Sequence, residues 1–78
     1  MKYNLPDGTN VEYRVLTVAD AVTVVNHTSD DPSMFREVIR LAVTKPEQTL
    51  ARLARLPAEQ TEFLASEILL AALRAHAG

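Results

Sequence analysis

The sequence predicts an α+β domain in which an N-terminal β-hairpin is followed by a bundle of about four helices. Apolar and polar residues alternate on both sides of a Pro6-Asp7-Gly8 turn, which is the period of half-buried strands. After residue 17 the apolar residues recur at spacings of three and four, with helix-start signals between them. The 78 residues contain no linker-like segment, so we expect one domain, with the hairpin over 1–16 and the helical body over 17–78.

The hairpin signal lies in the stretch KYNLPDGTNVEYRVL. Pro6 presets φ for a turn, Asp7 can bond its own downstream backbone, and Gly8 can take the positive φ of a tight turn. The strand after this turn is longer than the strand before it. An unpaired strand edge attracts another strand, and nothing later in the sequence has strand character. We therefore expect another chain to supply the strand that completes the sheet beside residues 11–16.

Two helices are predicted directly after the hairpin. Thr17 and Asp20 have the spacing of a capping box, which predicts a short helix from Thr17 to about His27. Asp31 followed by Pro32 is a capping acid and a proline in the first helical position. The apolar spacing in the first helix comes from Val18, Ala21, Val22 and Val25, and that in the second from Met34, Phe35, Val38, Ile39, Ala42 and Val43.

Two further helices are predicted in the second half. Thr44 and Glu47 have the capping-box spacing around a proline, and the helix they start should end before Pro57. It carries Leu50, Leu53 and Ala54. The final helix should run from about residue 58 to 75 and bury Phe63, Leu64, Ile68, Leu69, Ala72 and Leu73.

Apolar residues occupy nearly the whole circumference of this final helix. They cover more than the stripe of roughly 100° that a one-sided helix needs. Two interpretations follow. The helix is either central and covered all round, or it leaves an apolar face, including Leu70 and Leu73, of the kind that marks an interaction site.

Composition and spacing argue against an enzyme. The chain has no cysteine, and His27 and His76 lack a partner at metal-ligand spacing, so we expect no metal; His76 should pair with carbonyls at the helix C-terminus. Two glycines leave no phosphate-binding loop or oxyanion nest of the usual kind. We expect no catalytic residue, no cofactor and no small-molecule substrate.

Charge and hydropathy limit the classes of partner and the cellular location that the sequence favours. A net charge of -2 offers no concentrated basic surface for nucleic acid. The start of the chain lacks a signal-peptide pattern, and its apolar runs are too short to span a bilayer. We therefore expect a soluble protein that is made inside the cell and whose partners are other proteins or copies of itself.

Arg52 and Arg55 lie three residues apart in the stretch LARLARL. They could belong to a solvated face, a protein interface or a short basic stripe for nucleic acid. The last of these gives an alternative function, a small regulatory adaptor that contacts DNA or a nucleic-acid enzyme through these arginines. The candidate partner-binding residues are Val11, Tyr13, Val15, Leu16, Arg52, Arg55, Leu70 and Leu73.

The order LPDGTNVEYRVLTVAD, a short helix, DPSMFREVIRLAV and closing helices resembles the layout of small assembly proteins of tailed bacteriophages. Leu5 to Gly8 and Leu16 to Asp20 carry most of this resemblance to tail assembly chaperones and baseplate proteins, although the chain lacks a frameshift-type extension. The resemblance implies a structural or assembly role in a phage tail or baseplate. It implies a location in the host cytoplasm for an assembly factor or in the virion for a permanent component, and it leaves the choice between these two open.

Overall fold

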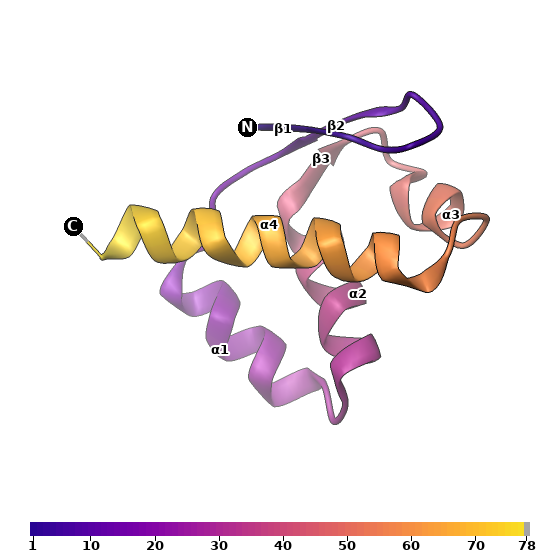
Figure 1. The fold of residues 1–78 in the computed structure, drawn as a ribbon. Helices are drawn as coiled ribbons and strands as arrows, with labels where there is room; N and C mark the ends of the chain where they lie inside the picture. Colours follow the sequence, from indigo (N-terminus) through magenta and orange to yellow (C-terminus); the bar gives the residue numbers. More distant parts are fainter. Residues whose placement is uncertain (78) are drawn as a thin grey trace.

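The computed structural model describes residues 1–77, and over that range it contains a three-stranded antiparallel sheet and four helices (Figure 1). The predicted α+β class with an N-terminal hairpin is confirmed. In the view of Figure 1, α4 crosses the molecule, with the sheet above it and α1 below it. The elements in chain order are β1 (Lys2–Asn4), β2 (Asn10–Tyr13), α1 (Val18–His27), α2 (Asp31–Ala42), β3 (Val43–Lys45), α3 (Thr49–Leu53) and α4 (Ala58–His76).

The hairpin forms where the alternating pattern predicts it, although β2 ends at Tyr13 and not near residue 16 as expected. β1 and β2 are antiparallel, with Tyr3 opposite Val11. In the turn, the Gly8 amide donates to the Leu5 carbonyl at 3.0 Å, and Gly8 has φ +90, a conformation that residues with a Cβ rarely adopt. The Asp7 carboxylate accepts a hydrogen bond from the Thr9 amide at 2.9 Å. Hydrogen bonding from Thr9 lowers the pKa of Asp7.

The prediction that another chain supplies the strand beside β2 is wrong, because β3 of the same chain occupies that edge. Its register places Lys45 opposite Glu12 and Val43 opposite Tyr13. The Thr44 hydroxyl also donates to the Glu12 carbonyl at 3.2 Å. The apolar spacing of α2 continues through Val43, so the sequence pattern predicted helix there, whereas the open edge of β2 draws these residues into the sheet. Thr44 therefore lies in a strand and does not cap α3, which begins at Thr49.

The starts of α1 and α2 follow capping rules, one as predicted and one shifted by a residue. The capping box of Thr17 and Asp20 is present, and the Asp20 amide donates to the Thr17 hydroxyl at 3.2 Å. The α2 cap is Asp30 and not Asp31, since Asp30 is extended and its carboxylate accepts from the Ser33 amide at 2.8 Å. Asp31 is already part of the helix, so the N-cap position is occupied by Asp30.

The core joins the inner face of the hairpin to α2 and α4. Its buried apolar residues are Leu5, Val11, Tyr13, Leu16, Val24, Val38, Ile39, Ala42, Leu53, Leu64, Ala65, Ile68 and Ala71. The expectation that Phe63 and Leu73 are buried is wrong, because they are 51% and 66% exposed. They lie outside the arc that carries Leu64 and Ile68, the arc that faces the core. The interpretation of α4 as a fully covered central helix is therefore also wrong.

Candidate functional site

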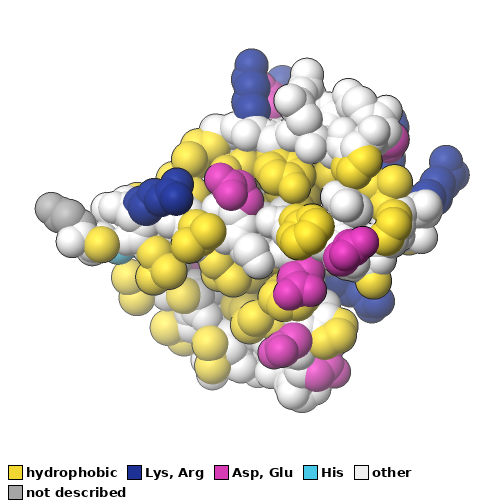
Figure 2. Space-filling view, in the orientation of Figure 1, with side chains coloured by type: hydrophobic (Ala, Val, Ile, Leu, Met, Phe, Trp, Pro, Cys, Tyr) yellow, Lys and Arg dark blue, Asp and Glu magenta, His cyan; other side chains and the backbone are white. Residues whose placement is uncertain are grey.

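Exposed apolar side chains gather on α1 and on the C-terminal half of α4. On α1, Val18, Val22 and Val25 are 69%, 53% and 72% exposed, and on α4 Leu73 is 66% exposed. Figure 2 shows yellow side chains over these two helices at the lower left. We call this region the α1–α4 surface, and its members are Val18, Ala21, Val22, Val25, Leu69, Ala72 and Leu73.

A groove of about 410 Å³ runs within this surface, between the two helices. Ala21 on α1 and Ala72 on α4 both line it, and their short side chains leave space that a partner's apolar side chain could fill. Its exposed lining is almost entirely apolar, which suits an apolar side chain better than a polar ligand. The full lining is Leu16, Thr17, Val18, Ala21, Leu69, Ala72, Leu73 and His76.

His76 provides a polar contact beside the groove. Its Nε2 lies 2.9 Å from the Leu16 carbonyl oxygen, which joins the last turn of α4 to the segment before α1. A carbonyl oxygen only accepts, so Nε2 is the protonated nitrogen in this bond. The prediction that His76 pairs with carbonyls at its own helix end is therefore replaced by a contact across the fold.

α1 is held at its N-terminus by polar contacts and buries little of itself. The Arg14 guanidinium donates to both carboxylate oxygens of Asp20, at 2.7 and 3.2 Å. Together with hydrogen bonds from Thr17, this contact holds the pKa of Asp20 far below its ordinary value. Val24 is the buried residue of the helix. The fold thus fixes the start of α1 while leaving its valine face open to solvent.

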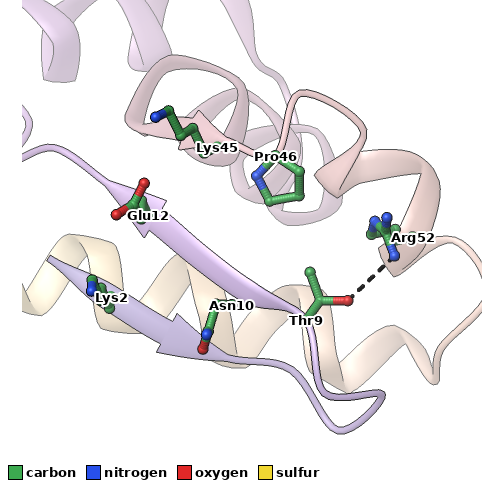
Figure 3. Close-up of a pocket in the computed structure, with 7 residues that line it drawn as sticks. All are labelled: Lys2, Thr9, Asn10, Glu12, Lys45, Pro46 and Arg52. Atoms are coloured by element: carbon green, nitrogen blue, oxygen red, sulfur yellow. Dashed lines mark hydrogen bonds between the residues drawn. The ribbon is translucent and has the colours of Figure 1, made fainter.

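A second, polar hollow lies on the outer face of the sheet (Figure 3). The strand register places Glu12 between Lys2 and Lys45 in one row across the three strands. The Arg52 guanidinium lies 3.4 Å from the Thr9 hydroxyl. The hollow has a volume of about 520 Å³ and is lined by Lys2, Thr9, Asn10, Glu12, Lys45, Pro46 and Arg52. Glu12 offsets part of the positive charge, which weakens any anion site here.

The structure separates the two arginines that the sequence placed on one helical face. α3 ends at Leu53, so Arg52 is helical whereas Arg55 lies in the following turn. Arg52 lines the hollow on the sheet and Arg55 does not. Both side chains are exposed, but they do not form a helical basic stripe.

The candidate residues of the hairpin point mainly into the core. Val11, Tyr13 and Leu16 are buried and Val15 is half-buried. Burial raises the pKa of the Tyr13 hydroxyl. These side chains hold the sheet on the helices, so a partner would reach the hairpin through its backbone edge or its outer face.

The candidate residues of α4, in contrast, are available. Leu70 is 44% exposed and Leu73 more so. The valines of α1 were missed as site residues, although their helical spacing was visible. Spacing shows that residues share a face, but it does not show whether that face meets the core.

Residues 1–77 contain no group of three or more His, Asp or Glu that could hold a metal ion. Over the same residues, no helix is both long enough and apolar enough to cross a bilayer.

The chain matches no protein-family model, no curated protein and no solved structure.

Proposed function

We propose that this protein is a non-enzymatic protein-interaction component that docks a partner through the α1–α4 surface. More specifically, we propose a structural or assembly component of a phage tail or baseplate, which acts in the host cytoplasm as an assembly factor or in the virion as a permanent component. The observation that carries the first statement is the exposed apolar face shared by α1 and α4. The second rests on the layout of the chain, which resembles small tail assembly and baseplate proteins.

The exposed valines of α1 lie side by side and form apolar surface that a partner could bury. Val18, Val22 and Val25 form one side of α1 and are each more than half exposed. Complete burial of a fully exposed side chain of this kind is worth roughly 1.5–3 kcal/mol. These valines are already partly buried, so each would contribute proportionately less to a complex, before the costs of association are subtracted. A contiguous apolar patch that contains a groove is typical of sites that take an amphipathic helix from another protein.

The alternative, an adaptor that contacts DNA through Arg52 and Arg55, has less support. The arginines do not share a helix, and Glu12 lies among the cations of the nearby hollow. A DNA contact would also weaken steeply with salt, whereas an apolar contact would not. Salt dependence of partner binding therefore separates the two functions.

Site-specific photo-crosslinking tests the proposal in cells that make the protein together with its natural partners. A photoreactive residue at Val22 or Leu73 should crosslink the same partner, because both positions lie on the α1–α4 surface. The matched control is Glu47, which is exposed and lies between β3 and α3, outside the α1–α4 surface. The second substitution Val25→Glu should abolish the crosslink from position 22, since it places a charge on the docking face.

Equal crosslinking from position 47, or none from positions 22 and 73, would contradict docking through this surface. A partner other than a tail or baseplate subunit would refute the specific role and leave the docking surface in place.

A further inference from the structure

We propose that the free edge of β1 pairs with β1 of a second copy of this chain, so that two three-stranded sheets become one. The sheet order is β1-β2-β3, which leaves β1 at an edge. This inference rests on the proposed function as a protein-interaction component and names the partner of a surface separate from α1 and α4. It also revises the expected open edge, which lies beside β1 and not beside β2.

The hydrogen-bond pattern shows which backbone groups of β1 point toward the open edge of the sheet. Met1 and Tyr13 exchange two hydrogen bonds, at 3.0 and 2.9 Å, and the Leu5 amide donates to the Thr9 carbonyl at 2.9 Å. In an antiparallel ladder alternate residues of one strand bond inward. The amide and carbonyl of Lys2 and of Asn4 therefore point away from β2, toward the open edge.

One antiparallel register uses all four of these groups. If a two-fold axis passes beside Tyr3, Lys2 lies opposite the partner's Asn4 and Asn4 lies opposite the partner's Lys2. Each of these pairs exchanges two hydrogen bonds.

The two neighbouring registers are less favourable for pairing between the strands. One sets Lys2 against the partner's Lys2, which places like charges directly opposite each other. The other sets Lys2 against the partner's Pro6, which has no amide hydrogen to donate. Pairing centred on Tyr3 is thus the register that the edge favours.

The side chains fit the same register. On the outer face, the row Lys45, Glu12 and Lys2 alternates in sign across the sheet, and the next residue would be the partner's neutral Asn4. On the inner face, Tyr3 is half-buried against the core and would lie beside the partner's Tyr3. Directly opposed aromatic residues stabilise antiparallel pairs. β1 has three residues, so the dimer should be weak and depend on concentration.

The test is the mass of the chain, measured by sedimentation velocity over a range of concentrations, for the wild type and two charge variants. Asn4→Glu places an acid opposite Lys2 twice in the dimer and should tighten association roughly 2- to 30-fold. Asn4→Lys places like charges at the same two positions and should weaken it by a similar factor. Both effects should shrink in about 1 M salt, because salt screens exposed charges.

Gln48→Glu and Gln48→Lys are the matched controls, since they make the same charge changes at an exposed residue that follows β3, the strand at the opposite edge of the sheet from β1. Thermal unfolding in dilute solution checks that the Asn4 variants fold. A chain that stays monomeric even as Asn4→Glu would overturn the proposal. A dimer whose dissociation constant does not change with the charge at position 4 would also overturn it. If such a dimer is lost on Leu73→Glu, the copies associate through the α1–α4 surface, and the proposed function survives without edge pairing.

Discussion

Truncating two apolar side chains of α4 should have very different effects on the free energy of unfolding. Ile68 is 0% exposed and Leu73 is 66% exposed, although they lie on the same helix. Removing a fully buried Ile side chain to Ala costs about 2–5 kcal/mol, and Ile to Val about 0.5–1.5 kcal/mol. Leu73→Ala should change stability by no more than about 0.5 kcal/mol, because most of that side chain is already in water.

These expected changes in the free energy of unfolding are large compared with the total stability of a chain of this size. At roughly 0.05–0.15 kcal/mol per residue, 78 residues give a total stability of about 4–12 kcal/mol. Ile68→Ala could therefore unfold the domain outright, and Ile68→Val is the variant that stays measurable. One kcal/mol shifts the midpoint of thermal unfolding by roughly 4–8 °C in a domain of this length. Ile68→Val should lower it by roughly 2–12 °C.

Urea unfolding followed by far-UV circular dichroism measures these differences, at two protein concentrations about tenfold apart. The expected order is wild type and Leu73→Ala close together, with Ile68→Val clearly below them at both concentrations. If Leu73→Ala destabilises the dilute protein as much as Ile68→Val does, Leu73 is packed within the monomer. The α1–α4 surface would then not be open, and the reasoning behind the proposed function would fail.

Three further predictions concern the ends of α1 and α2 and the hairpin turn. Because Arg14 lowers the pKa of Asp20 in the folded state, Asp20 stabilises the fold above its ordinary pKa near 4, and this contribution is lost as the pH falls through the folded value. Asp20→Asn should therefore flatten the acid side of a plot of urea midpoint against pH, and an unchanged plot would contradict the role of the ion pair. Asp30→Ala should lower the thermal midpoint more than Asp31→Ala, since Asp30 caps α2; the reverse order would restore Asp31 as the cap. Gly8→Ala should lower the free energy of unfolding in urea by about 1–2 kcal/mol because of the positive φ at this position. Steric contact adds nothing to this cost, because an added Cβ would meet no neighbour within 4 Å. An unchanged free energy of unfolding would mean that the turn relaxes.

Features with a local physical cause were predictable from the sequence. The turn at Pro6, Asp7 and Gly8 depends on the conformational preferences of three neighbouring residues. The capping box of Thr17 and Asp20 depends on a spacing of three residues. Both appear in the structure as expected, and so do the ends of α1 and α4 to within about a residue.

β3 could not be predicted in this way. Val43 continues the apolar spacing of α2, and three residues are too few for alternation to compete with a helical pattern. The strand exists because β2 presents an open edge where α2 ends, and the Arg14 amide reaches the Ala42 carbonyl at 2.9 Å. Only the folded chain brings these segments together.

Local preferences and periodicity were enough to specify the hairpin and the order of the helices, and they showed that apolar residues occupy nearly the whole circumference of α4. Two other properties depend on the packed chain. These are the edge of the hairpin that stays open and the exposed face on which the valines of α1 join Leu73. Periodicity gives a helix its faces, whereas the direction in which each face points depends on packing between segments far apart in the chain.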